Sequence, residues 1–295
     1  MRGIILAFLI LSSVAQAAET LYATSLRAQS GGTTRLAGNL YAIDPSDGTS
    51  QLIGAIKVDG TPVGLISIAE NPRTHMLYGL TAGISEVFPR SLVTLNLETA
   101  TATMIAPLST RASDMGFDDE GNLYIWAPDL DRLAKVDPAS GVATPVGEDK
   151  LIDTAGGGLA IDGRKQRALV AVTGAAGTLD SVDLKTGVAT RGAKLSGAPY
   201  TTAIDNLTFG PNGELYAVNS NGGAPSHAAL IVIDPASGKV RNVGPLPDDV
   251  RGLIFAAPRK KAASELPLRA IALGILGVIG VGVIAYAFLH KQAVK

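Results

Sequence analysis

The stretch that decides the fold is LIVIDPASGKVRNVGPL, residues 230–246, whose pattern is repeated in LAKVDPASGVATPVG, residues 133–147. In both, the sequence Asp-Pro-Ala-Ser-Gly separates two apolar runs. The Asp234 side chain can accept a hydrogen bond from the backbone two residues further on, Pro235 fixes φ, and Gly238 tolerates the left-handed conformation. Each stretch is therefore predicted to form a β-hairpin.

The same hairpin recurs along the chain and alternates with a second one. Further copies of the first hairpin cover residues 40–54, 92–108 and 179–195, and the second hairpin covers residues 64–80, 115–127, 158–172 and 207–218. The turns of the first hairpin begin at Asp44, Asn96, Asp137, Asp183 and Asp234. Two hairpins make a four-stranded unit, and such units recurring every ~40–50 residues are typical of propeller blades. The five copies predict an all-β, five-bladed β-propeller.

The two ends of the repeat region complement each other. The first copy lacks an opening strand, whereas residues 252–257, Gly-Leu-Ile-Phe-Ala-Ala, match the start of the second hairpin at residues 158–161. We expect this C-terminal strand to pair with the N-terminal strand at residues 21–26. That pairing would complete the first blade, close the ring and remove both open sheet edges. It disfavours the alternative architecture, a flat β-solenoid.

Several phrases of the repeat resemble those of a known group of propellers. GLAID (158–162), LYAV (215–218) and LIVIDPASG (230–238) are similar to the repeats of NHL-type and gluconolactonase-like propellers and of related bacterial secreted propellers. The resemblance extends over residues 21–258, and its motifs are turn and core residues. It therefore implies the fold and is not specific for an activity.

Both ends of the chain carry targeting signals. Arg2, the apolar run 4–11 and Ala15-Gln16-Ala17 have the order of a signal peptide with its cleavage site. Residues 270–289 contain no charged side chain over a length that can cross the hydrocarbon layer. The predicted organisation is a signal peptide (1–18), a propeller ectodomain (19–258), a basic juxtamembrane linker (259–269), a transmembrane helix (270–289) and a cytoplasmic tail (290–295).

This organisation predicts a cellular location and a class of partner. The propeller is expected on the periplasmic or extracellular side of a bacterial cytoplasmic membrane, held by a single span. Small residues at Ala270, Gly274 and Gly277 share one face of the predicted helix, and such residues let a second helix approach closely. The expected partners are therefore the membrane itself and a membrane or extracytoplasmic protein.

Composition excludes several functions. Lys and Arg number 25 against 26 Asp and Glu, so there is no basic field and no nucleic-acid partner is predicted. The absence of cysteine excludes disulfides, thiolate zinc sites and a cysteine nucleophile. No Gly-x-Ser-x-Gly elbow is present, so a serine hydrolase is not indicated and no catalytic residue is assigned.

Candidate ligand-binding residues lie where the innermost strands begin, because that is the mouth of a propeller's central channel. Aligning the five blades gives a ring of Leu65, Asp114, Gly158, Asn206 and Gly252, preceded by a ring of Gly64, Ser113, Gly157, Asp205 and Arg251. Glycine is the commonest residue in both rings. The polar exceptions Asp114, Asp205, Asn206 and Arg251 are the predicted ligand-binding residues.

These residues leave three functions open. In the leading hypothesis the protein is a non-enzymatic binding or scaffold module, such as an accessory subunit of a membrane complex. The first alternative is a metal-dependent lactonase or hydrolase, in which Asp114, Asp205 and Asn206 supply oxygen ligands to Ca²⁺ at the channel mouth. Without a metal, the same groups would bind water and the opposing Arg251. The second alternative is a receptor for surface glycans. No cofactor is predicted, and Ca²⁺ is required only by the lactonase alternative.

Overall fold

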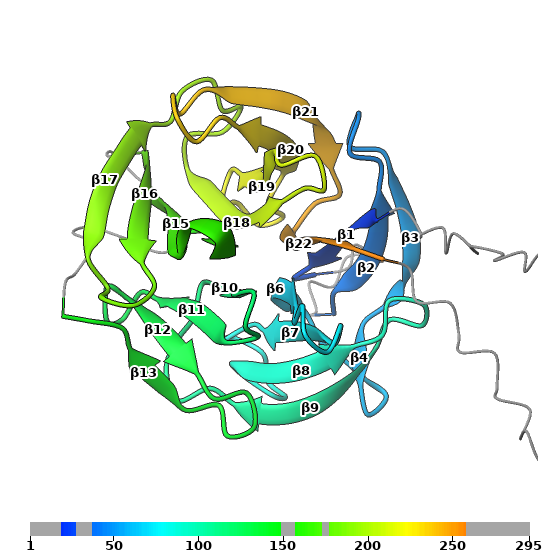
Figure 1. The fold of residues 1–295 in the computed structure, drawn as a ribbon. Coiled ribbons are helices and arrows are strands. Elements are labelled where there is room, and N and C mark those ends of the chain that lie inside the picture. Colours follow the sequence, from blue (N-terminus) through cyan, green and yellow to red (C-terminus); the bar gives the residue numbers. More distant parts are fainter. Residues whose placement is uncertain (1–18, 28–36, 149–156, 173–176, 258–295) are drawn as a thin grey trace, which may run out of the picture. The chain divides into compact units, whose positions relative to one another are not determined.

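The chain forms five β-sheets arranged in a ring around a common centre (Figure 1). The computed structural model describes residues 19–27, 37–148, 157–172 and 177–257. Within each sheet, the four strands that follow one another outward from the centre pair antiparallel. The predicted all-β, five-bladed propeller is confirmed.

The blades are numbered here from the N-terminus, and their strands are given from the centre outward. Blade 1 contains β22 (Val250–Ala256), β1 (Thr20–Ser25), β2 (Asn39–Ile43) and β3 (Ser50–Ala55). Blade 2 contains β6 (Leu65–Glu70), β7 (Leu77–Thr81), β8 (Ser91–Leu95), β9 (Thr101–Pro107), β4 (Lys57–Val58) and β5 (Thr61–Pro62). Blade 3 contains β10 (Asp114–Phe117), β11 (Leu123–Ala127), β12 (Arg132–Val136) and β13 (Ala143–Pro145). Blade 4 contains β14 (Leu159–Asp162), the 3-10 helix η1 (Gly163–Lys165), β15 (Arg167–Val172), β16 (Thr178–Asp183) and β17 (Ala189–Lys194). Blade 5 contains β18 (Ala203–Phe209), β19 (Leu215–Ser220), β20 (Ala228–Ile233) and β21 (Val240–Leu246).

The ring closes through blade 1, as the sequence predicts. The last strand, β22, pairs antiparallel with the first, β1, so that Thr20 lies opposite Ala256 and Thr24 opposite Gly252. The C-terminal strand is the innermost strand of the blade to which the N-terminal strand belongs (Figure 1). Because the N-terminal and C-terminal strands share one sheet, the ring cannot open there without breaking the backbone hydrogen bonds between β1 and β22.

The Asp-Pro-Ala-Ser-Gly turns adopt the predicted geometry. In the turn at residues 234–238, Asp234 Oδ1 accepts a hydrogen bond from the backbone N–H of Ala236 at 2.9 Å, and Gly238 has φ +71°. The copy that begins at Asn96 lacks this glycine, and Ala100 takes its place with φ +55°. An alanine in the left-handed region is strained, so the turn is held by its flanking strands.

Blade 2 has two strands, β4 and β5, that the repeat pattern does not predict. The connection leaving blade 1 forms β4 and β5, and β4 pairs parallel with the outer strand β9, with Lys57 opposite Thr101. This gives blade 2 six strands in place of the predicted four. The connection therefore joins blade 1 to blade 2 by backbone hydrogen bonds at the outside of the ring.

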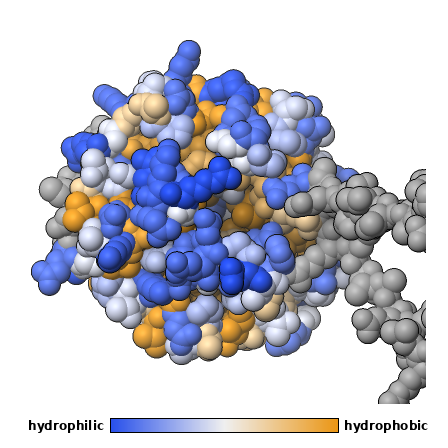
Figure 2. All heavy atoms as spheres, in the orientation of Figure 1, coloured by the Kyte–Doolittle hydropathy of each residue, from blue (hydrophilic) through white to orange (hydrophobic). Residues whose placement is uncertain are grey.

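Apolar side chains pack between neighbouring blades and form the core. Tyr78 of blade 2 contacts Phe117 of blade 3, and Tyr216 of blade 5 contacts Phe255 of blade 1, each with ring centroids 5.0 Å apart. Such tilted aromatic pairs are favourable beyond the area that they bury. Figure 2 shows that hydrophilic residues gather over the middle of one face of the ring, outside this core.

The predicted terminal segments lie outside the described residues. These segments are the signal peptide, the basic linker, the span at 270–289 with Ala270, Gly274 and Gly277, and the tail. Within the described part of the chain, no helix combines the length and apolar character needed to cross a membrane.

Candidate functional site

Asp114 lies fully buried at the start of the innermost strand of blade 3. Its Oδ1 accepts hydrogen bonds from Ser67 Oγ at 2.5 Å, from Asn206 Nδ2 at 2.6 Å and from the backbone N–H of the next residue, Met115, at 2.9 Å. Its Oδ2 accepts from the backbone N–H of Leu159 at 2.7 Å and of Leu207 at 3.3 Å. One carboxyl group thus links β10 to the inner strands β6, β14 and β18.

Two opposing effects act on the Asp114 carboxyl. Burial raises its pKa, because a charge removed from water is costly, and the hydrogen bonds from Leu159, Ser67, Met115 and Asn206 lower it, because they stabilise the ionised form. Burial is the larger effect, and the pKa stands at about 7 against the usual 3.8. The group is therefore close to half protonated at neutral pH.

Asn206 is a close polar partner of Asp114 and retains an unsatisfied acceptor. Its Nδ2 donates to Asp114, whereas its buried Oδ1 has no hydrogen-bond partner among the described residues. Buried acceptors without a partner are rare because each one costs free energy. A rotated Asn206 amide could accept a hydrogen bond from the protonated form of Asp114.

The predicted ring of inner residues is wrong at one position. The alignment placed Leu65 beside Asp114, but β6 contains a register shift between Leu65 and Ser67, and Leu65 packs in the apolar core. Ser67 therefore reaches Asp114. A β-bulge inserts an extra residue in one strand and reverses the faces that follow. The sequence signal that could have identified Ser67 is that it is the one hydroxyl residue in an apolar run, Leu-Ile-Ser-Ile-Ala.

Asp205 and Arg251 form a second, separate pair nearer the mouth. The Arg251 Nη1 donates to Asp205 Oδ1 and to Ser220 Oγ, and Ser220 Oγ donates to Asp205 Oδ2. The side chains of Asp205 and Arg251 are only 16% and 17% exposed, so water screens the ion pair weakly. The four predicted ligand-binding residues thus divide into two pairs, and Ser220 was not predicted.

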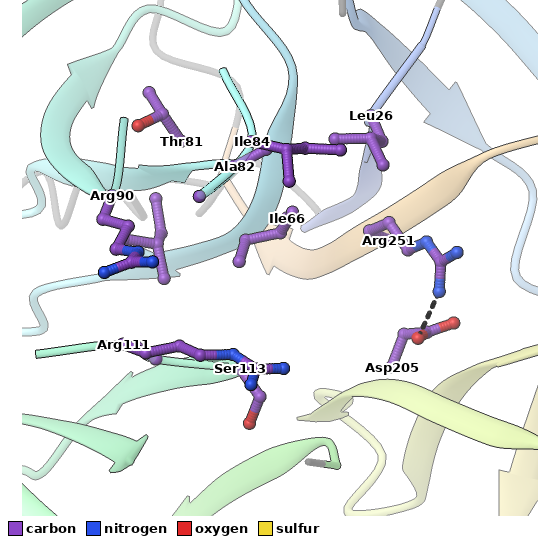
Figure 3. Close-up of a pocket in the computed structure, with 13 residues that line it drawn as sticks. Leu26, Ile66, Thr81, Ala82, Ile84, Arg90, Arg111, Ser113, Asp205 and Arg251 are labelled. Atoms are coloured by element: carbon purple, nitrogen blue, oxygen red, sulfur yellow. Dashed lines mark hydrogen bonds and ion pairs between the residues drawn. The ribbon is translucent and has the colours of Figure 1, made fainter. Parts of the chain in front are cut away.

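A pocket of about 430 Å³ opens at the mouth of the channel (Figure 3). Asp205 and Arg251 line one side of it, and Arg90 and Arg111 lie on the side away from them (Figure 3). Sequence reasoning missed Arg90 and Arg111 because both belong to connections between strands, where the repeat pattern gives no register. Exposed loop positions of this kind commonly carry binding residues.

A second cavity, of about 170 Å³, lies further along the inner strands. It is lined mainly by apolar side chains, among them Phe117, Ile161 and Phe209. Along the strands, Asp114 and Asn206 come before these residues and after the residues of the mouth. The residues of the Asp114 network therefore lie between those that line the two cavities along the inner strands.

The predicted calcium ligands fit a cation poorly in this arrangement. Ca²⁺ takes six to eight oxygen ligands. The Asp114 carboxylate already accepts five hydrogen bonds, and the Asp205 carboxylate is held by Arg251 and Ser220. The described residues also contain no cluster of three or more His, Asp or Glu suited to a metal. Metal analysis of the purified protein would test for the Ca²⁺ that the lactonase alternative requires.

The fold and this site define a five-bladed propeller in which a buried polar network joins the inner strands of four blades. No family model matches the chain, and no curated protein matches it. The resemblance to gluconolactonase-like propellers that the repeat implied is confirmed at the level of fold by the five blades.

Three of the similar solved structures come from bacteria. A protein of unknown function from Bacteroides caccae has 13% identity and a TM-score of 0.48, with 81% of this chain and 99% of that one covered. TolB from Acinetobacter baumannii has 13% identity and a TM-score of 0.43, with 80% and 66% covered. The gluconolactonase XC5397 from Xanthomonas campestris has 14% identity and a TM-score of 0.46, with 82% and 84% covered. At this identity the likeness concerns the fold alone.

Proposed function

We propose that this protein is a binding module held at the outer face of a bacterial cytoplasmic membrane. The observation that carries the proposal is the commitment of the central polar side chains to one another. Asp114 bonds to three neighbouring inner strands, and Asp205 is held by Arg251 and Ser220. Groups engaged in this way stiffen the ring and are poorly placed to move protons or attack a substrate.

The shape of the propeller supports the same function. A ring closed through β1 and β22 holds the blades in fixed positions, so the loops at the mouth are presented from a rigid base. The pocket among those loops has a volume typical of ligand-binding sites. A rigid frame with a loop-lined pocket is suited to recognition.

The proposed location and the proposed partner are inferred from the sequence alone. A span at 270–289 would keep the propeller close to other membrane proteins. The small residues Ala270, Gly274 and Gly277 would provide a contact face for a partner helix. We therefore propose an accessory subunit of a membrane complex.

Mild detergent extraction from the native host, followed by size-exclusion chromatography and mass spectrometry, tests this role. We expect the protein to migrate above its monomer mass together with a stoichiometric membrane protein. The double variant Gly274→Leu/Gly277→Leu should reduce that co-purification at least ~10-fold. Ala272→Leu, on the opposite helix face, serves as the matched control and should leave it unchanged.

Two outcomes would contradict the proposal. Migration of the wild-type protein alone at monomer mass would remove the support for a complex. Hydrolysis of gluconolactone that requires Ca²⁺ and is lost in Asp205→Ala would support the lactonase alternative in place of a binding module.

A further inference from the structure

The charged and apolar side chains that line the mouth pocket have no part in the membrane role proposed above. We infer that it binds a small organic carboxylate that carries an apolar group, with Arg90 and Arg111 receiving the carboxylate. This inference concerns a ligand of the propeller and is independent of the protein partner proposed above.

The charge of the pocket favours an anion. Its lining contains three guanidinium groups, from Arg90, Arg111 and Arg251, and one carboxylate, from Asp205. Asp205 is already paired with Arg251. The two remaining guanidinium groups therefore leave the pocket positively charged.

Arg90 and Arg111 are available to a ligand, whereas Arg251 is not. The structure gives the Arg90 guanidinium no hydrogen-bond or ion-pair partner among the described residues. The Arg111 Nη1 lies 3.6 Å from Asp129 Oδ1, and both side chains are more than half exposed, so this contact is weak. Figure 3 shows both arginines on the side of the pocket away from the Arg251–Asp205 pair. A carboxylate could replace the exposed contact to Asp129 without breaking a buried interaction.

Arginine is suited to this task because of its shape. Its planar guanidinium presents a fork of N–H donors that matches the two oxygens of a carboxylate. Hydrogen bonds between ionised partners are about twice as strong as those between neutral groups. Two such side chains that line the same pocket can fix the orientation of a small acid.

The rest of the lining explains the apolar part of the ligand. Leu26, Ile66 and Ala112 contribute apolar surface to the same pocket. Ile84 also lines it and is 64% exposed, so a ligand could cover much of this side chain. An apolar group covering these residues would bury surface that water now contacts. Inorganic phosphate would leave this surface uncovered, which favours a carboxylate on an apolar chain.

N-acetyl-leucine and N-acetyl-leucinamide form a matched pair of probes because they differ in the carboxylate. Calorimetric titration of the purified full chain in detergent should detect binding of the acid at concentrations up to about 10 mM and at least ~10-fold weaker binding of the amide. Affinity for the acid should fall as salt is added, because screening weakens exposed charge interactions.

Variants locate the site. Arg90→Gln and Arg111→Gln should each weaken binding of N-acetyl-leucine at least ~5-fold, with the fold unchanged by circular dichroism. Arg191→Gln makes the same change of charge on the outer strand β17, outside the pocket, and should have no effect. Equal binding of acid and amide, no binding of the acid, or retention of binding in both variants would overturn the inference. Binding of inorganic phosphate in the absence of acid binding would also overturn it. None of these outcomes depends on whether a protein partner co-purifies with the full chain.

Discussion

At the scale of single residues, Asp114 is fully buried and its carboxyl accepts five hydrogen bonds. These bonds offset part of the cost of removing the carboxyl from water. The neighbouring blades contribute donors from Ser67, Asn206 and two backbone N–H groups, so the carboxyl fastens the inner ends of four blades together. Its charge therefore couples the stability of the whole ring to pH.

The contribution of Asp114 to the free energy of unfolding should fall as the pH rises from about 4 to about 7. The native Asp114 keeps its proton up to a pKa of about 7, whereas the unfolded carboxyl loses it near the usual 3.8. The native state then binds more protons than the unfolded state across this window, and its stability declines as they are released. The effect is at most about 4 kcal/mol, and it levels off above about pH 7.

Urea unfolding between about pH 4.5 and pH 8 measures this slope. In Asp114→Asn the side chain cannot titrate, so the slope over this window should be smaller than in the wild type. The variant should also be less stable at every pH, because its amide presents a donor to groups that are themselves donors. An identical pH slope in the two proteins would show that Asp114 is not the titrating group.

At the scale of the elements, the inner strands approach one another so closely that side chains would not fit. A Cβ added to Gly158 at the entry to β14 would lie 2.7 Å from the carbonyl carbon of Asn206 in the next blade. A Cβ on Gly252 of β22 would lie 2.4 Å from Thr24 Oγ1 and 3.1 Å from the backbone of β6. Glycine is therefore required at these two ring positions because a Cβ would clash with the neighbouring strand. At the equivalent positions Asp114 and Asn206, the structure has room for a side chain.

Gly158→Ala should destabilise the propeller by about 1–3 kcal/mol, because backbone atoms of blade 5 would have to move. Gly54→Ala, on the outer strand β3, is the matched control, since its new Cβ would meet only Ala100 Cβ at 3.5 Å. The midpoint of urea unfolding should shift for Gly158→Ala and remain near the wild-type value for Gly54→Ala. Equal shifts in the two variants would mean that the close approach of blades 4 and 5 is not what restricts this position.

At the scale of the whole molecule, the ring and the predicted anchor have separate roles. Every strand of the five blades lies between Thr20 and Ala256, and the ring is closed by backbone pairing within that range. We expect the membrane attachment to reside entirely in the C-terminal segment, because residues 270–289 hold the long uncharged run of the sequence.

A chain that ends at Pro258 should therefore leave the membrane fraction and appear in the soluble extracytoplasmic fraction. The full chain should resist extraction by carbonate at high pH. The linker variant Lys260→Gln/Lys261→Gln, which retains the span, serves as a control and should remain in the membrane. Persistence of the truncated chain in the carbonate-washed membranes would show that the propeller itself attaches there.

The sequence by itself determined the architecture of the propeller. The Asp-Pro-Ala-Ser-Gly turns and the complementary ends at residues 21–26 and 252–257 were sufficient, because hairpin formation depends on neighbours in the chain and the repeat supplies it five times. Asp114, Asn206, Asp205 and Arg251 were also found from the sequence, as polar exceptions among the glycines of the ring.

Only the tertiary structure decided how these residues combine. Ser67 meets Asp114 across 47 positions of sequence because a bulge in β6 shifts the register, and Asn206 meets it across 92. Arg90 and Arg111 reach the mouth pocket from irregular connections. Local patterns specify the strands, but bulges and loops set which side chains meet, because those contacts depend on the packing of one blade against the next.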